Sequence, residues 1–393
     1  MSIRKQTVGV IFGSRSVEHD VSIVTAQQVM QAMSPAKYEV VPIYITRSGN
    51  WVTGPLLTEL KNFQAGNIEE LMGIKETIVS PAIQHHGMIT PPIAGMLGRN
   101  MLRKLDVIFP VVHGTHGEDG TLQGLFEMSD IPYVGCGVMA STVANDKIAT
   151  KALLRENGLP TLDYVAFRRQ DWLTDRDAVL TRIEAKLSYP VFVKPATLGS
   201  SIGIARPADR QGLIAAIDVA LNFDRRVIVE SALLESIEVN CALLGNGDPR
   251  ASVLEQPVSF QDFLTYEEKY MRGGTGSGMK GADRQIPAPI PDDLTAKIRQ
   301  IAIDAFKAID GRGTARIDFL VKDGNPYIEE INTMPGSLSF YLWQAESMTP
   351  AMVVDELIRL AHEAAAEKRR TLYDYKTDLI THAALRGVKG MKK

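Results

Sequence analysis

VGVIFG at residues 8–13 is a short apolar run that ends in glycine, and it decides the fold class. A continuous apolar run of this length predicts a strand buried on both faces, as in a parallel sheet. Apolar positions at helical spacing follow it, and strand-like runs return at residues 38–46 and 106–112. Strand, helix and strand joined by short connections predict a parallel α/β domain, residues 1–144, that binds ligands near its strand ends.

Two further α/β blocks follow this N-terminal domain. The central block, residues 145–237, opens with an Asn-Asp pair that can cap a helix, and it contains three strand-like runs. The C-terminal block, residues 238–366, contains a helical pattern and then two strands joined by DGN at residues 323–325, a hairpin turn signal. Residues 262–289 are rich in glycine and lack an apolar period, which predicts a lid loop. The charged tail, residues 367–393, predicts a helix and then a disordered end.

Composition excludes several classes of function for the 393 residues. The chain has 43 Lys and Arg against 46 Asp and Glu, a net charge of −3, which argues against a general nucleic-acid binder or a basic membrane-surface protein. No stretch approaches the roughly 20 uncharged apolar residues of a membrane span, and the N-terminus lacks the apolar region of a signal peptide. Two cysteines are too few for a disulfide framework and fit a reducing cytoplasm. We therefore expect a cytoplasmic protein with no nucleic-acid or membrane partner.

The strongest chemical signal lies on the expected hairpin of the C-terminal block. ARIDF at residues 315–319 and EEIN at residues 329–332 would bring Asp318, Glu330 and Asn332 near one another across two paired strands. Carboxylate and amide oxygens form a hard ligand set that suits Mg²⁺ rather than zinc. The alternative is a set of surface acids on an ordinary hairpin. Apolar residues alternate with the polar ones, which gives one core face and one organised polar face and favours metal ligation.

A second signal is KPATLGSSIG at residues 194–203. Lys194 ends a strand, and the small residues after it, among them Gly199 and Ser201, suit a loop whose backbone N–H groups approach phosphate oxygens. The lysine precedes the glycines, so the stretch is not a P-loop, and glycine–serine loops are mostly plain turns. Lys147, on the helix that opens the central block, could add a second charge toward phosphates or could be an ordinary solvated lysine.

Two further loops follow apolar strands of the N-terminal domain, where an α/β sheet binds its ligands. His113 and His116 lie in HGTHGEDG at residues 113–120. With no cysteine or third histidine nearby, a zinc site is disfavoured and a substrate-orienting loop is preferred. Glu18, in GSRSVE at residues 13–18, could receive a substrate ammonium or could favour the start of the helix electrostatically.

Taken together, these motifs resemble the D-alanine–D-alanine ligase family of ATP-grasp enzymes. The match keeps the family's order from about residue 8 to residue 336 and consists of FGSRSVEHDVS, HGTHGEDGTLQG, NDK, KPATLGSSIG, IEV, YEEKY, ARIDF and EINTMPG. Each motif alone would be weak, but the joint pattern is highly specific. The resemblance implies an ATP-grasp fold of three domains, with ATP between the central and C-terminal domains, and a homodimer formed through the N-terminal domain.

The resemblance also implies a role for each matching residue. Lys147, Lys194, Gly199 and Ser201 would face the phosphates of ATP, Glu230 the adenine and Glu238 the ribose, while Asp318, Glu330 and Asn332 would hold two Mg²⁺ ions, or Mn²⁺ in their place. Glu18 would bind the ammonium of the first D-alanine and would be linked through Ser200 to Tyr270 of the lid. His113 would lie near the carboxylate of that substrate, and Lys269 near the phosphate that is transferred. Arg316 and the backbone N–H of Gly336 would stabilise an oxyanion, and Ser339, Tyr341 and Leu342 would line the site of the second substrate.

The implied reaction is the ATP-dependent ligation of two D-alanines through an acyl phosphate, for peptidoglycan precursors. Three features depart from the family's usual pattern. Tyr341 stands where the family usually has a serine that helps to bind the second substrate. The lid is longer than usual and carries Arg272, Lys280 and Arg284, and one extra residue separates Glu230 from Glu238. The alternatives are a related ligase that joins D-alanine to another amino acid or a D-hydroxy acid, and a nucleotide-binding homologue without activity. The lid motif Lys269-Tyr270 favours the dipeptide, because ester-forming relatives usually lose that tyrosine.

Overall fold

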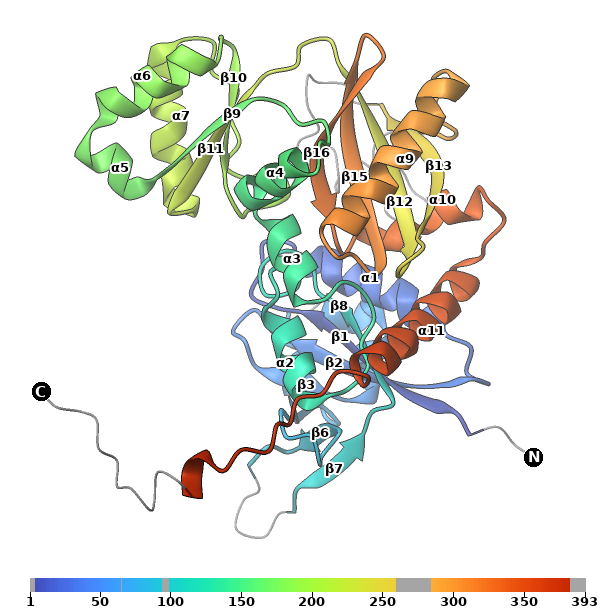
Figure 1. The fold of residues 1–393 in the computed structure, drawn as a ribbon. Coiled ribbons are helices and arrows are strands. Elements are labelled where there is room, and N and C mark those ends of the chain that lie inside the picture. Colours follow the sequence, from blue (N-terminus) through green and yellow to red (C-terminus); the bar gives the residue numbers. More distant parts are fainter. Residues whose placement is uncertain (1–3, 65, 94–98, 259–283, 382–393) are drawn as a thin grey trace, which may run out of the picture.

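Figure 1 shows three blocks of helices and strands, with the central and C-terminal blocks side by side above the N-terminal one. The structure, a computed structural model, describes residues 4–64, 66–93, 99–258 and 284–381. Helices and sheets are mixed throughout, so the α/β (α+β) class expected from the sequence is confirmed. The exact domain boundaries stay predictions.

The N-terminal block is built on a sheet in the order β4-β3-β2-β1-β8. β1 (Gln6–Gly13) carries the VGVIFG run, is almost entirely buried, and is parallel to β2 (Tyr38–Ile45) and β8 (Val107–Val111). Helix α1 (His19–Ala32) connects β1 to β2, as the spacing predicts. Because β1 and β8 run in the same direction, the loops that follow them, which contain Glu18 and His113, meet at one edge of the sheet.

The remaining elements of this block lie around that sheet. Two short strands extend it by antiparallel pairing, and a separate small sheet has the order β5-β6-β7. These elements are β3 (Trp51–Thr53), the short helices η1 (Pro55–Thr58), η2 (Leu60–Phe63) and η3 (Ile68–Glu70), β4 (Lys75–Glu76), β5 (Ile78–Val79), β6 (Gly87–Thr90), β7 (Met101–Lys104), α2 (Thr121–Ser129) and α3 (Val138–Asn145).

The central block begins with α4 (Lys147–Glu156) and contains an antiparallel sheet in the order β10-β11-β9. Its elements are β9 (Tyr164–Arg168), α5 (Arg169–Thr174), α6 (Arg176–Lys186), β10 (Val191–Pro195), α7 (Arg210–Phe223) and β11 (Arg226–Ser231). Alternate strand residues such as Val193 and Val229 pack against these helices. The residues between them, including Lys194 and Glu230, therefore lie on the opposite face of the sheet.

The C-terminal block contains an antiparallel sheet in the order β14-β13-β12-β15-β16 and one long helix that packs against it. Its elements are β12 (Ile237–Gly245), β13 (Arg250–Pro257), β14 (Arg284–Gln285), α9 (Asp292–Ala308), β15 (Gly313–Lys322) and β16 (Asn325–Asn332). Ile317 and Phe319 pack against α9, whereas Arg316 and Asp318 alternate with them and face away from it. The predicted hairpin is confirmed, since Asp323 and Gly324 form its turn in the left-handed backbone region.

Most of the predicted lid, residues 262–289, lies outside the described residues. Its described end is partly a strand, because β14 pairs with β13 through Gln256 opposite Gln285 and Pro257 opposite Arg284. The lid itself stays a prediction.

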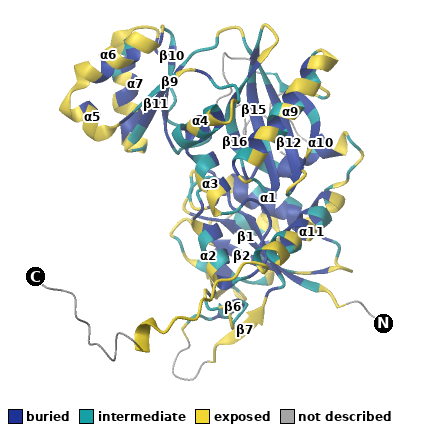
Figure 2. Cartoon of the chain, viewed as in Figure 1, coloured by how far each residue is buried: buried dark blue, intermediate teal, exposed yellow. Residues whose placement is uncertain are grey.

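The chain ends with η4 (Gly336–Ser339), α10 (Phe340–Gln344) and α11 (Pro350–Lys368), and these return to the N-terminal block. Val354 and Leu357 of α11 share one hydrophobic core with Val10 and Phe109 of the N-terminal sheet. Figure 2 shows this buried side of α11 and the exposed chain beyond it. In the part of the chain that the structure describes, no helix is long and apolar enough to cross a membrane.

Candidate active site

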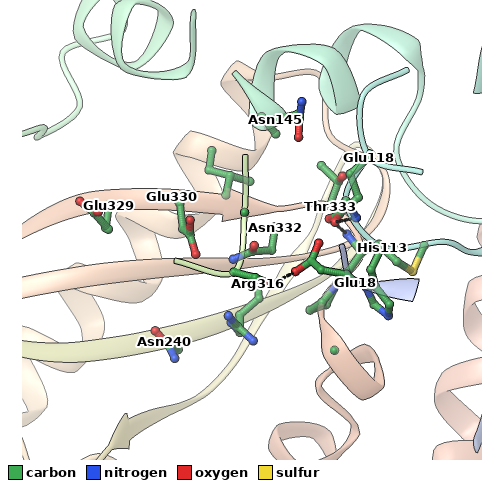
Figure 3. Close-up of a pocket in the computed structure, with 18 of the residues that line it drawn as sticks. Glu18, His113, Glu118, Asn145, Asn240, Arg316, Glu329, Glu330, Asn332 and Thr333 are labelled. Carbon is green, nitrogen blue, oxygen red and sulfur yellow. Dashed lines mark hydrogen bonds between the residues drawn. The ribbon is translucent and has the colours of Figure 1, made fainter. Parts of the chain in front are cut away.

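The predicted site residues gather where the three blocks meet. A cleft of about 740 Å³ lies between the central and C-terminal sheets and is lined by Lys194, Gly199, Ser201, Glu230 and Glu238, among others. A second pocket continues from it toward the N-terminal block. Figure 3 shows Glu329 and Glu330 at one end of this pocket and Glu18, His113 and Glu118 at the other, with Arg316 and Asn332 between them.

A buried cluster of lysines and glutamates lies at the inner end of the cleft. Lys194 Nζ donates to Glu230 Oε2 at 2.8 Å and to Glu329 Oε1, and Lys151 Nζ lies 3.4 Å from Glu230 Oε1. Although burial opposes ionisation of Glu329, Lys194 and Lys151 hold the pKa of its carboxyl down to about 2. Lys147 adds a third ammonium, which donates to the backbone oxygen of Leu198 at 2.9 Å. Three ammonium groups therefore lie together at the cleft, and Glu330 faces Lys147 as a further carboxylate. Ammonium groups in such a position can bind phosphate.

The hairpin of β15 and β16 brings the predicted metal ligands together. Asp318 and Glu330 are cross-strand partners, and Asn332 Nδ2 donates to Asp318 Oδ2 at 3.1 Å. Arg316 donates to both oxygens of Asp318, from Nε at 2.6 Å and from Nη2 at 2.7 Å, which fixes the guanidinium beside the hairpin. Among the described residues, no group of three or more His, Cys, Asp or Glu could hold a metal ion. The predicted metal-ligand set has only two carboxylates, those of Asp318 and Glu330, and its third member is the side-chain amide of Asn332.

Glu18 lies on the N-terminal side of the pocket and is buried. Its Oε1 accepts a hydrogen bond from the hydroxyl of Ser200 in the glycine–serine loop, so two distant motifs meet as the resemblance implies. Gly114 allows this approach: its φ is +67°, and a Cβ there would lie 2.5 Å from Glu18 Oε2. A carboxylate in this position can accept hydrogen bonds from a small ammonium group.

His113 and Glu118 join the N-terminal block to the segment that contains Gly336. His113 Nδ1 lies 2.8 Å from the backbone oxygen of Met334, and its Nε2 lies 3.0 Å from Thr25 Oγ1. Glu118 accepts from the backbone N–H of Met334 at 2.8 Å and of Gly114 at 2.9 Å. Burial lowers the pKa of His113 to about 4, so the ring is neutral and donates from Nδ1 to the carbonyl. Burial and the neighbouring Glu18 carboxylate raise the pKa of Glu118 to about 8.

These bonds bear on the role expected for His113. The side chain lines the pocket, but both ring nitrogens already have protein partners. In this structure His113 therefore orients the backbone of Met334 rather than presenting a ring N–H to a substrate carboxylate.

The residues after Gly336 differ in what they face. Gly336 and Tyr341 line the pocket, whereas Ser339 and Leu342 are fully buried and are not among its lining residues. Leu342 follows Tyr341 on α10, and one residue is about 100° of helical turn, so its side chain points into the hydrophobic core instead. The prediction that Ser339 and Leu342 line the second-substrate site is not supported by their positions. Lys269 and Tyr270 lie outside the described residues.

The sequence analysis missed three pocket residues, Glu118, Glu255 and Glu329, and the buried Lys151 that pairs with Glu230 beside the cleft. Lys151 follows Lys147 by four residues on α4, a spacing that places both on one helix face and could have revealed it. Glu329 falls at an irregularity where Asp318 pairs with Glu330 but Phe319 pairs with Ile328. Such a bulge changes the direction of a side chain relative to the regular strand. Glu329 and Glu330 therefore both line the pocket, although neighbouring residues of a regular strand would point to opposite faces of the sheet.

Comparison with known proteins shows the family to which the chain belongs. Residues 7–136 match the family described as D-ala D-ala ligase N-terminus, and residues 153–359 match the family described as D-ala D-ala ligase C-terminus. The chain belongs to the D-alanine–D-alanine ligase family. Among its relatives, the D-alanine–D-alanine ligase of Geobacillus thermodenitrificans is 40% identical over 376 residues, which cover 94% of this chain and 99% of the relative. The ligase of Thermosipho africanus is 39% identical over 374 residues, 95% of this chain and 97% of the relative.

Solved structures of the ligase family share the fold. The VanG D-Ala:D-Ser ligase from Enterococcus faecalis is similar with a TM-score of 0.78 and 32% identity, covering 91% of this chain and 100% of that one. The D-alanine–D-alanine ligase from Coxiella burnetii is similar with a TM-score of 0.76 and 27% identity, covering 98% of this chain and 99% of that one. The ATP-grasp fold expected from the resemblance is confirmed.

Proposed function

We propose that this protein joins two D-alanines into D-alanyl-D-alanine at the expense of ATP, through an acyl phosphate. The observation that carries the proposal is one continuous pocket with a carboxylate–hydroxyl pair, Glu18 and Ser200, at one end and the Lys147 and Lys194 ammonium groups toward the other. Arg316 lies between the two ends. An amino acid bound by Glu18 would direct its carboxylate toward a nucleotide phosphate bound by the lysines.

The hairpin fits Mg²⁺, or Mn²⁺ in its place. Asp318 and Glu330 offer carboxylate oxygens from paired strands, and Asn332 offers an amide oxygen beside them, a donor set typical of hard divalent cations. Bound there, the ions would neutralise phosphate charge. Lys147 and Lys194 would contact the phosphates, and Glu230 and Glu238, which line the same cleft, would contact the adenosine.

The chain's own residues support two chemical steps. First, an oxygen of the donor carboxylate attacks the γ-phosphorus and the bond from that phosphorus to ADP breaks. Then the amine of the second amino acid attacks the carbonyl carbon, the bond from carbon to phosphate oxygen breaks, and phosphate leaves with the proton that the amine loses. An oxyanion exists after the amine attacks and before phosphate leaves. Two groups would stabilise it: Arg316, which Asp318 holds in place, and the backbone N–H of Gly336. His113 and Glu118 hold the backbone of Met334, two residues before Gly336.

We also propose that the reaction takes place in the cytoplasm, where ATP is available, and supplies peptidoglycan precursors. We further propose a homodimer formed through the N-terminal block. Size-exclusion chromatography with light scattering would give twice the 43.1 kDa chain mass for such a dimer.

The test is ATP-dependent phosphate release with D-alanine, with products identified by mass. We expect D-alanyl-D-alanine, and we expect release to need a divalent cation, so that EDTA stops it and Mg²⁺ restores it. A panel of L-alanine, D-serine and D-lactate as second substrates, each with D-alanine, addresses the acceptor. Release only when one of these accompanies D-alanine would contradict the proposal, and no release with any pair would exclude ligase activity.

Arg316→Ala separates binding from chemistry. Because Arg316 contacts the hairpin rather than the lysine cluster, the variant should still bind ATP in a calorimetric titration but lose dipeptide formation by about a hundredfold or more, as removal of one oxyanion donor does. Normal turnover in this variant would remove Arg316 from the mechanism.

A further inference from the structure

A second cluster of charged and aromatic side chains lies in the same pocket, on the side of Tyr341. The Tyr341 hydroxyl donates to Glu255 Oε1, and Asn240 Nδ2 donates to the same oxygen at 3.2 Å. Arg284 lies over the Tyr341 ring, with its guanidinium carbon 4.1 Å from the ring centroid, and its Nε is 3.7 Å from Glu255 Oε2. Glu255 is 2% exposed, so the arginine is stacked on one face and ion-paired to a buried carboxylate.

This cluster differs from the other cationic positions of the pocket. Among the described lining residues the lysines and arginines are Lys147, Arg284 and Arg316. Lys147 donates into the glycine–serine loop on the nucleotide side. Arg316, which donates to both oxygens of Asp318, is the residue already proposed to stabilise the oxyanion. Arg284 is 33% exposed and remains open to the pocket beside Tyr341. It is held in place by stacking on Tyr341 and by the Glu255 carboxylate, and its side chain lines the pocket.

An amino acid that attacks the acyl phosphate carries its own carboxylate into this pocket. A buried carboxylate needs a charged partner, and the planar fork of arginine binds carboxylates through two parallel hydrogen bonds. We propose that Arg284, positioned by Tyr341 and Glu255, binds the carboxylate of the second amino acid and makes the acceptor site selective for acceptors that carry that negative charge. This inference rests on the proposed function and assigns a subsite within it.

The subsite also explains how a tyrosine can occupy position 341. A phenol there is too large simply to replace a small hydroxyl side chain, and its hydroxyl is already bonded to Glu255. The ring instead provides the surface on which Arg284 stacks. Tyr341 and Glu255 are therefore positioning residues, and the contact with the acceptor is made by Arg284.

A competition between two acceptors tests the assignment. D-Alanine and D-alaninamide have nearly the same size, but only the first carries a carboxylate. Both are supplied with ATP and Mg²⁺, and the two products, D-alanyl-D-alanine and its amide, are measured by mass. We expect the wild-type protein to favour the acid strongly and Arg284→Gln to shift the product ratio toward the amide by about tenfold to a hundredfold, the range for one charge-assisted hydrogen-bonded pair. Arg284→Lys should restore part of the preference.

Two measurements make the outcome decisive. Hydroxylamine traps the acyl phosphate as D-alanyl hydroxamate and has no carboxylate, so Arg284→Gln should form hydroxamate at the wild-type rate. Arg250→Gln is the matched control, because Arg250 also lies over a ring of α10, 5.1 Å from the Trp343 centroid, but outside the pocket. An unchanged product ratio in Arg284→Gln, an equal shift in Arg250→Gln, or loss of hydroxamate in Arg284→Gln would each overturn the assignment. Absence of both hydroxamate and dipeptide from the wild-type protein would instead refute the proposed function.

Discussion

His113 is a single buried residue that affects both the stability of the fold and the geometry of the pocket. Its ring bridges Thr25 of α1 and the backbone of Met334, two residues before the proposed oxyanion donor. Protonation would place a charge in a fully buried position and would replace the acceptor at Nε2 by a donor. The contact to Thr25 therefore favours a neutral ring.

This bridge predicts a specific dependence of stability on pH. The pKa of His113 is about 4 in the folded protein and about 6.5 in the unfolded chain. The unfolded chain therefore binds a proton that the folded protein does not, and the free energy of unfolding should fall as pH decreases from 6.5 to 4, by up to about 3 kcal/mol. His113→Asn keeps a donor toward Met334 but cannot titrate, so urea denaturation at several pH values should show a smaller acid loss in the variant.

The matched control for this measurement is His116→Asn, whose side chain is 46% exposed. It should lose stability with falling pH as the wild-type protein does. Equal acid sensitivity of His113→Asn and wild type would show that the ring does not resist protonation in the fold.

At the scale of elements, α4 positions Lys147, which lines the cleft, and Lys151, which is buried beside it, from its first two turns. Asp146 caps it by accepting from the backbone N–H of Ile148 and Ala149, at 3.0 and 3.1 Å, and it also pairs with Arg226 at 2.5 Å. Lys147 and Lys151 then project from one side of the helix. By fixing the start of α4, the Asp146 cap sets the direction in which the Lys147 and Lys151 ammonium groups project.

Asp146→Ala should lower the free energy of unfolding by about 1–2 kcal/mol, as loss of a helix cap does, and should weaken ATP binding because Lys147 follows directly. Chemical denaturation and isothermal titration with ATP measure the two effects. Asp209→Ala is the comparison, since Asp209 caps α7 in the same way through Gly212 but is not among the residues lining the cleft. It should cost similar stability without changing ATP affinity; equal weakening by both would mean that the cap of α4 has no special effect on the cleft.

At the scale of the whole molecule, α11 connects the end of the described chain to its beginning. The helix contributes Val353, Val354, Leu357 and Ile358 to the core that contains the N-terminal strands. Residues more than 200 positions away in the sequence therefore complete the core against the N-terminal sheet. Ala242 and Leu244 of the C-terminal block belong to the same core, whereas the central block has a core of its own.

Two truncations test this dependence. Removal of residues 350–393 should abolish soluble folding, because several buried side chains at about 1.5–3 kcal/mol each exceed the usual stability of a domain. Removal of residues 372–393 alone should leave the thermal midpoint and ligation unchanged, since residues 372–381 are exposed. Thermal denaturation of both proteins measures the difference. A stable product of the longer truncation would show that α11 is dispensable for the N-terminal core.

Sequence patterns alone predicted the parallel strands β1, β2 and β8, the polar face of the β15–β16 hairpin and the family to which the chain belongs. These features rest on local apolar periods and on motifs of adjacent residues, which a linear pattern records directly. Only the tertiary structure decided that Glu329 shares a cleft with Lys194, that both nitrogens of His113 are bonded, and that Glu255, Tyr341 and Arg284 form one cluster. Most of these contacts join residues far apart in the chain, such as Lys194 with Glu329 and Glu255 with Tyr341, so no local sequence pattern records them.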